Sequence, residues 1–287
     1  MFRRAGYAVL PVARRAAAHV PGVTRLDVAG GDPEDLARLL VRHDVDVVVN
    51  ATGGWVPTED EMRSAHVHLV GNLLTAVAGL PRRPRIVQIG SIHEYGPVPA
   101  GTAIHEETEP GPRTPYARTK AAGSAAVLSA TEAGEVDGVV LRAVNVCGPH
   151  TTTASFLGGV AAKLRAAGPG ERIALTIAEA RRDYIDVRDV AEAVLSAAVR
   201  PVAGQAINIG RGEAVSMRDL VSMLLAAAGR GMDAVDVTGA PVESKGGGWT
   251  MADISRARRL LGWRPRRDLR ASIQDMWDVH NDRQETP

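Results

Sequence analysis

The stretch that decides the fold is VDVVVNATGG, residues 45–54. Its valine-rich first half predicts a buried β-strand, and the polar and glycine residues after Val49 end that strand. Short apolar runs of the same kind occupy residues 7–12, 85–89 and 138–146. Longer amphipathic stretches separate these runs. The alternation of strands and helices predicts an α/β fold with a parallel, doubly wound sheet.

Helices are expected at residues 33–43, 58–80 and 115–132. Asp32 suits the N-cap of the first of these helices, because Pro33 follows it at the first helical position. The pattern is looser toward the C-terminus. There it predicts helices at residues 189–199, 216–228 and 253–261, a strand at 206–209 and a loop at 243–248.

Composition excludes several classes of protein. The chain has 287 residues, a formal net charge of +1 and 45% hydrophobic residues, so neither nucleic acid nor an anionic membrane is an expected partner. No apolar run reaches the roughly 18 residues of a membrane span, and the N-terminus does not resemble a signal peptide. The single cysteine, Cys147, excludes a disulfide scaffold and is expected to be a small buried residue. A cytoplasmic location is therefore expected.

The strongest chemical signal is Tyr116 followed by Lys120, which are i and i+4 on one predicted helix. The two side chains share a face of that helix, and an ammonium beside a phenol is expected to lower the pKa of the phenol. Ser91 ends the predicted strand at 85–89, at the edge where parallel sheets bind ligands. We expect its hydroxyl to bind the same substrate oxygen that Tyr116 protonates.

The Asn50 turn, Ser91, and Tyr116 with Lys120 follow one another along the chain. In this order they make the chain resemble the extended short-chain dehydrogenases, the family of sugar-nucleotide epimerases, dehydratases and ketoreductases. The resemblance covers nearly the whole chain and implies a Rossmann-like cofactor domain at residues 1–149. A smaller substrate lobe is expected at 150–287, with 183–210 returning to the first domain. The resemblance implies Ser91, Tyr116 and Lys120 as the catalytic triad, and Asn50, Ala51 and Thr52, with Tyr116 and Lys120, as cofactor-binding residues.

Further positions take their expected roles from the same resemblance. Asn145, in the block LRAVNVCGP, would contact the substrate diphosphate, and Arg182, in RDYIDVRDVA, would hold its nucleotide. Asp27 and Val28 resemble the pair that meets the adenine of the cofactor. Homodimerisation through the helices at 58–80 and 115–132 is also a family expectation.

The residues after Ser91 narrow the activity. Dehydratases of the family place Asp-Glu there, whereas this chain has Ile92 and His93, so 4,6-dehydration is not expected. Arg14 and Arg15 follow the segment that corresponds to the family's second strand. NAD-preferring members of the family carry an acidic residue at the end of that strand. Two arginines suit the 2′-phosphate of NADP(H), although NAD(H) stays possible.

The predicted activity is therefore the NADPH-dependent reduction of the 4-keto group of a dTDP-4-keto-6-deoxyhexose, in the biosynthesis of antibiotic sugars. An NAD-dependent sugar-nucleotide 4-epimerase is the first alternative. A cofactor-free binding protein is the second, because the family's first strand and its glycine loop have no counterpart in the chain. We expect that the natural protein starts upstream of this sequence.

Several residues keep two interpretations. His93 and Glu94 either contact substrate or pack within the turn. Trp55 either caps the sugar or belongs to the core. His66 stands near a point where family members often place Asn, which bends the helix and assists a proton relay. His66 and His68 face apart at i and i+2, and no histidine has zinc spacing, so no metal site is expected.

Overall fold

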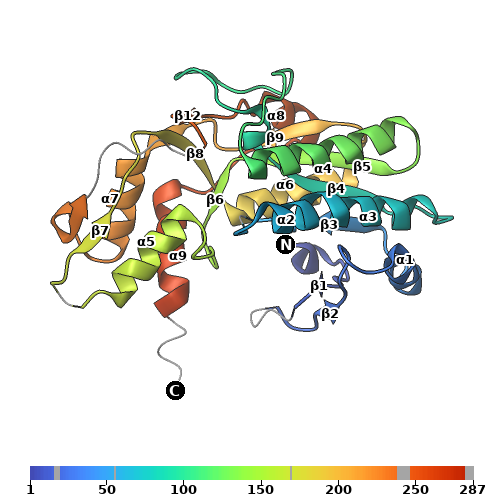
Figure 1. Ribbon diagram of the computed structural model, residues 1–287, viewed down its shortest axis with the longest axis horizontal. Coiled ribbons are helices and arrows are strands. Elements are labelled where there is room, and N and C mark those ends of the chain that lie inside the picture. Colours follow the sequence, from blue (N-terminus) through green and yellow to red (C-terminus); the bar gives the residue numbers. More distant parts are fainter. Residues whose placement is uncertain (16–19, 55, 169, 238–245, 282–287) are drawn as a thin grey trace. The chain divides into compact units, whose positions relative to one another are not determined.

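The computed structural model describes residues 1–15, 20–54, 56–168, 170–237 and 246–281 (Figure 1). The chain divides into two compact units. The first comprises residues 1–94, 113–142 and 191–207, and the second comprises residues 95–112, 143–190 and 208–287. The domains expected from the sequence divide the chain at other points: residues 95–112 and 183–190 both belong to the second unit.

The first unit is built on a four-stranded sheet in the order β3-β4-β5-β9. Its strands are β3 (Val47–Asn50), β4 (Arg85–Ser91), β5 (Asp137–Ala143) and β9 (Ala206–Ile209), whose last residues belong to the second unit. β3 and β4 run parallel, with Asn50 opposite Gln88. The carboxyl ends of β3 and β4 thus lie at one edge, which is where the expected site residues Asn50 and Ser91 are found.

Helices α1 (Pro33–Arg42), α3 (Leu69–Ala78) and α4 (Pro115–Glu132) pack with this sheet in the first unit. Asp32 caps α1, as predicted, by accepting a hydrogen bond from the Glu34 amide. The long helix expected at 58–80 is present in three parts, because α2 (Glu59–Arg63) leads into a π-helical segment, η2 (Ser64–His68), before α3 begins. Sequence periodicity does not reveal this wider turn.

The N-terminal segment differs from its prediction. Residues 7–12 are expected as a strand, but of these only Val12 lies in a strand, the two-residue β1 (Val12–Ala13), and a 3-10 helix, η1 (Phe2–Ala5), precedes the range. Among the described residues, β1 pairs in parallel with β2 (Thr24–Arg25), in a two-stranded sheet. That the family's first strand and glycine loop have no counterpart in this chain remains a prediction.

The predicted strand at 138–146 also divides. It becomes β5 and a separate strand, β6 (Asn145–Cys147), which pairs in parallel with β8 (Arg181–Asp186). The second unit holds a sheet in the order β10-β8-β12, with β6 also on β8, and a small parallel pair, β11-β7. The remaining strands are β7 (Ile173–Leu175), β10 (Ala214–Ser216), β11 (Val235–Val237) and β12 (Trp249–Thr250).

Helices α5 (Phe156–Ala166), α7 (Met217–Ala227) and α9 (Leu269–Asn281) enclose the apolar core of the second unit. The short helices there are η4 (Met232–Ala234) and α8 (Ser255–Leu261), while α6 (Val187–Val199) is divided between the two units. The predicted helices at 189–199, 216–228 and 253–261 are confirmed with small shifts at their ends. The loop expected at 243–248 lies partly outside the described residues. No described helix is long and apolar enough to cross a membrane.

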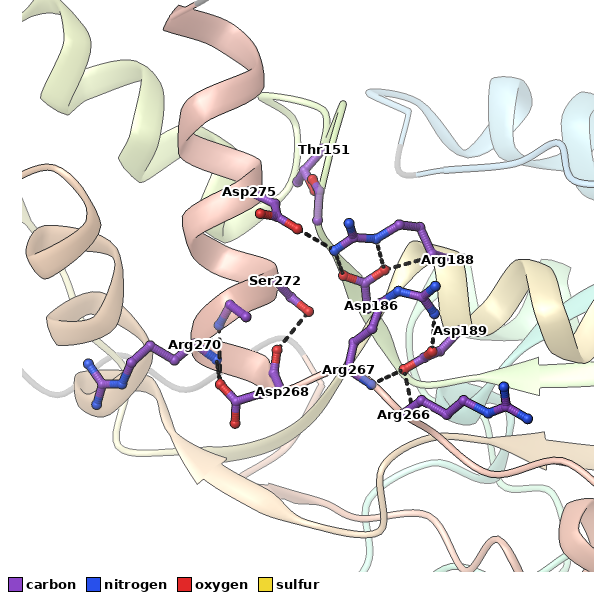
Figure 2. A network of polar contacts seen from close by, with 12 residues as sticks. Thr151, Asp186, Arg188, Asp189, Arg266, Arg267, Asp268, Arg270, Ser272 and Asp275 are labelled. Carbon is purple, nitrogen blue, oxygen red and sulfur yellow. Dashed lines mark hydrogen bonds and ion pairs between the residues drawn. The ribbon is translucent and has the colours of Figure 1, made fainter. Parts of the chain in front are cut away.

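A network of ion pairs joins β8, the start of α6 and the segment before α9 (Figure 2). Asp186 is almost fully buried and accepts hydrogen bonds from the Arg188 amide, at 2.7 Å, and from the Arg188 guanidinium. The same guanidinium also forms an ion pair with Asp275 at 2.6 Å. Asp189 is fully buried and accepts from the amides of Arg266 and Arg267, both at 3.0 Å, and from the Arg267 guanidinium. We call these residues the β8–α6 network.

Candidate active site

The turn after β3 is held in place by Asn50. Its side chain donates to Gln88 Oε1 across the sheet, at 2.8 Å, and its Oδ1 accepts from the Thr52 amide and hydroxyl. Ala51 and Thr52 are exposed. Lys120 Nζ donates to the carbonyl of Thr52 at 3.2 Å and to that of Ile89 at 3.0 Å. One buried lysine thereby joins α4 to the ends of both β3 and β4.

Tyr116 and Lys120 both lie on α4, which begins at Pro115, as the sequence predicts. Thr114 caps this helix by accepting from the Ala117 amide at 3.1 Å. Tyr116 is half-buried and forms a hydrogen bond with Ser91, whereas Ser91 and Lys120 are almost fully buried. Ser91, Tyr116 and Lys120 therefore meet at one place in the first unit.

The pKa of Tyr116 contradicts one expectation. Burial raises it to about 12, the hydrogen bond with Ser91 lowers it, and the charge of Glu94 raises it further. Burial likewise lowers the pKa of Lys120 to about 8, against the charge of Glu94. The predicted lowering of the phenol pKa is therefore wrong, because removal of the phenol from water outweighs the hydrogen bond with Ser91. Tyr116 is thus a protonated phenol at neutral pH.

His66 lies in the π-helical segment η2 and is almost fully buried. Its Nδ1 shares a hydrogen bond of 2.8 Å with Thr119 Oγ1, and its ring stands edge-on to Tyr116 with the centroids 5.5 Å apart. Burial, followed by the charge of Lys120, lowers its pKa to about 4, although the nearby backbone of Gly53 and Gly54 opposes the shift. A neutral imidazole therefore lies beside the phenol, and a π-turn of this kind often marks a functional site.

The close approach of these elements depends on two glycines. A Cβ at Gly123 of α4 would come within 2.4 Å of the His66 carbonyl oxygen. Gly53 has a positive φ of 94°, and a Cβ there would lie 2.3 Å from the His66 ring. Glycine at these positions lets α4, η2 and the turn after β3 come together.

Residues 1–210 match the NAD dependent epimerase/dehydratase family. The chain belongs to this family. A dTDP-6-deoxy-L-talose 4-dehydrogenase (NAD(P)(+)) of Kitasatospora kifunensis is 39% identical over 96% of this chain and 89% of its own length. A GDP-6-deoxy-D-mannose reductase of Pseudomonas aeruginosa is 30% identical over 62% of each chain.

Solved structures of family members share the fold. A UDP-glucose 4-epimerase of Thermotoga maritima with UDP-glucose superposes with a TM-score of 0.86 at 19% identity, over 99% of this chain and 94% of that one. RMD of Pseudomonas aeruginosa, complexed with NADPH, gives 0.79 at 24% identity, over 93% and 92%. Together with the family match, these findings confirm the family, the α/β class and the NAD(P)-dependent enzyme class predicted from the sequence.

The other expected cofactor residues of the family lie in the first unit. Arg14 and Arg15 are both exposed and directly follow β1. Asp27 is exposed, and its carboxylate accepts hydrogen bonds from the Ala29 and Gly30 amides, so it caps a turn. Val28 is half-buried and packs on the apolar core. The donor set of the two arginines fits a phosphate monoester.

The expected substrate residues are distributed between the units. His93 is half-buried, and its ring stands edge-on to Tyr116 at 6.4 Å. Asn145 is half-buried in the second unit and donates to the Asp183 carbonyl at 3.2 Å. Arg182 is buried there and donates to Thr250 Oγ1 at 3.3 Å and to the Gly247 carbonyl. The register of β6 and β8 places Asn145 and Arg182 on neighbouring strands. Trp55 lies outside the described residues.

Sequence reasoning missed one buried group of residues. Glu94 is fully buried, and Ser124 and Arg142 both donate to its carboxylate. The signal was Arg142, an arginine within the apolar run at 138–146, because a charge in a buried strand needs a buried partner. The expectation for Cys147 is confirmed: it is fully buried, and burial raises its pKa to about 12, so it is not a nucleophile at neutral pH.

Proposed function

We propose that the protein catalyses the NADPH-dependent reduction of the 4-keto group of a dTDP-4-keto-6-deoxyhexose. The observation that carries this proposal is the position of the Tyr116 phenol, which shares a face of α4 with Lys120 and forms a hydrogen bond with Ser91. A phenol in this position can supply a proton to a developing alkoxide, as the reducing direction requires. The relative at 39% identity, whose name describes a 4-dehydrogenase of dTDP-6-deoxy-L-talose, supports the same ring position and nucleotide.

NADPH, when bound, supplies the hydride for this reaction. The Ser91 hydroxyl hydrogen-bonds the carbonyl oxygen, and Tyr116 donates its proton to that oxygen as negative charge develops on it. Lys120 fixes the ends of β3 and β4 through its bonds to the Thr52 and Ile89 carbonyls, and supplies a positive charge near the reacting oxygen. Ile92 is almost fully buried and has no proton to transfer, which supports reduction over 4,6-dehydration.

The preference for NADPH follows from Arg14 and Arg15. Arg14 and Arg15 are exposed directly after β1, and guanidiniums donate charge-assisted hydrogen bonds of the kind that a 2′-phosphate accepts. Asn145 and Arg182 remain proposed contacts of the substrate diphosphate and nucleotide, respectively. Homodimerisation through the helices at 58–80 and 115–132, a cytoplasmic location and a role in antibiotic-sugar synthesis also stay predictions.

The test is an absorbance assay at the nicotinamide band, with the dTDP-4-keto-6-deoxyhexose formed in place by a dTDP-glucose 4,6-dehydratase. We expect one NADPH to be consumed per dTDP-6-deoxyhexose formed.

The double substitution Arg14→Ala and Arg15→Ala should raise KM for NADPH about tenfold or more and leave KM for NADH unchanged, since each charge-assisted bond contributes roughly 1.5–3 kcal/mol. Interconversion of two sugar nucleotides without net NADPH consumption would instead identify an epimerase. Failure to bind either nicotinamide would exclude both enzymes.

A further inference from the structure

The strongest unassigned feature of the first unit is the carboxylate of Glu94. The residue lies in the 3-10 turn η3 (Ile92–Tyr95) directly after β4, and its exposed fraction is 0%. Its Oε1 accepts from the Ser91 amide at 2.8 Å and from Ser124 Oγ at 2.9 Å, while its Oε2 accepts from Arg142 Nε at 2.8 Å. Removing a carboxylate from water costs several kcal/mol, so a group buried this completely requires such donors.

We propose that Glu94 is a positioning residue for the reaction, which fixes the Ser91 turn against α4 and sets the electrostatic environment of Tyr116 and Lys120. This inference rests on the proposed function. Glu94 itself is fully enclosed by protein and acts through the residues that it holds.

The geometry of α4 supports this role. Tyr116, Lys120 and Ser124 follow one another at intervals of four residues, so they form one face of the helix. The Ser124 hydroxyl, which donates to Glu94, therefore lies one turn beyond the Lys120 ammonium, on the same face of α4. Through Ser124 and the Ser91 amide, a single carboxylate links the turn that carries the serine to the helix that carries the tyrosine and the lysine.

Gly90 leaves the space that the Glu94 carboxylate occupies. A Cβ at Gly90 would lie 2.6 Å from Glu94 Oε1 and 2.9 Å from Ser124 Oγ, so any other residue at position 90 would displace the pair. On the far side, Arg142 of β5 meets the second carboxylate oxygen, and its side chain is also buried, with 9% exposed. The cluster thus spans β4, α4 and β5, the three elements around the catalytic residues.

The charge of Glu94 also reaches the catalytic groups. It raises the pKa of Lys120, against the burial that lowers this pKa to about 8, and it raises the pKa of Tyr116. Among the described residues, the other titratable groups beside these two side chains are His66, whose own pKa Lys120 lowers, and His93, whose ring stands edge-on to Tyr116; Arg142 lies beyond Glu94. If Glu94 were neutral, Lys120 would lose part of its positive charge at neutral pH.

The first test needs no substrate. The chain has 3 lysines, Lys120, Lys163 and Lys245, so 13C-lysine labelling gives few NMR signals to assign, and a Lys120→Met variant identifies the signal of interest. In Glu94→Gln we expect the Lys120 pKa to fall below its wild-type value. The matched control is Asp137→Asn, which removes another carboxylate–arginine pair of β5, with Arg85, and should leave the Lys120 pKa unchanged. An equal Lys120 pKa in wild type and Glu94→Gln would overturn the electrostatic part of the proposal.

The second test separates positioning from folding. The double variant Glu94→Leu with Arg142→Met replaces the buried pair by apolar residues, so it leaves no unpaired buried charge and is expected to fold. Its unfolding midpoint in urea should be lower than that of wild type, because the Ser91 amide and the Ser124 hydroxyl lose an acceptor. Its kcat should fall about tenfold or more with KM for the sugar nucleotide within twofold, whereas Asp137→Asn keeps wild-type kcat. A stable double variant with wild-type kcat would overturn the positioning role. If wild type reduces no keto sugar, the proposed function fails, but the lysine titration still decides the electrostatic effect of Glu94.

Discussion

Each unit of the molecule buries carboxylates beside arginines, but the two arrangements differ in what surrounds the charges. In the β8–α6 network of the second unit, burial would raise the pKa of Asp186, but hydrogen bonds from the Arg188 side chain and amide hold the pKa low (Figure 2). In the candidate active site of the first unit, burial prevails and moves the pKa values of His66, Tyr116 and Lys120 to about 4, 12 and 8. The first pattern is typical of a structural network, and the second of a site that performs chemistry.

The difference has an energetic meaning. A fully hydrogen-bonded carboxylate such as Asp189 stabilises the fold only as long as all its donors are present. A histidine that burial holds neutral, or a lysine whose pKa burial lowers, costs stability that the rest of the unit must offset. Substitutions should therefore change mainly stability in the β8–α6 network and mainly activity in the active site.

Tyr116→Phe should give the largest effect. It removes the proton donor and keeps the ring, so kcat for the keto sugar should fall about a thousandfold while the unfolding midpoint in urea changes little. The control is Tyr184→Phe, which alters another buried tyrosine in the core of the second unit and should keep most of the activity. Equal losses of kcat in the two variants would contradict the division between chemical and structural sites.

Asp189→Ala should produce the converse result. It leaves the Arg266 and Arg267 amides and the Arg267 guanidinium without their acceptor, so the free energy of unfolding should fall by about 3 kcal/mol. Urea unfolding measures this loss, and kcat of the folded protein should stay within about twofold of wild type. Asp275→Ala is the matched control, because Asp275 is 43% exposed and its pair with Arg188 should contribute less than about 1 kcal/mol.

The smallest expected effect concerns His66 and pH. Its folded pKa, about 4, lies below its ordinary value of 6.5, so the unfolded chain binds a proton that the folded protein rejects between these two pH values. The stability associated with the neutral ring is therefore complete above about pH 6.5 and is lost as the pH falls toward 4. Between pH 7 and pH 5 the loss amounts to about 2 kcal/mol.

Urea unfolding at both pH values should show this loss in wild type and not in His66→Gln, which retains a polar side chain that cannot titrate. The exposed His68 of the same π-helical segment provides the control, and His68→Gln should lose as much stability as wild type does. If wild type and His66→Gln lost equal stability at pH 5, His66 would not be the neutral histidine described above.

The elements that the sequence specified correctly are those with local causes. α4 begins at Pro115 and ends at Glu132 as predicted, because proline at the first position and a threonine N-cap act within one turn. The spacing of Tyr116 and Lys120 needs only helix geometry, and the valine-rich run before Asn50 needs only strand periodicity. Together with the family motifs, these local signals were sufficient for the α/β class, the family and the meeting of Ser91 with Tyr116.

Tertiary structure alone decided the rest. Glu94 and Arg142 are 48 residues apart, and no periodicity pairs them. The strand expected at 138–146 divides because its two halves find partners in different sheets, and the helix at 58–80 contains a π-turn where it approaches Gly123 of α4. The pKa of Tyr116 moved opposite to its prediction for the same reason. A neighbouring lysine is visible in the sequence, but burial depends on every element that the fold brings around the phenol.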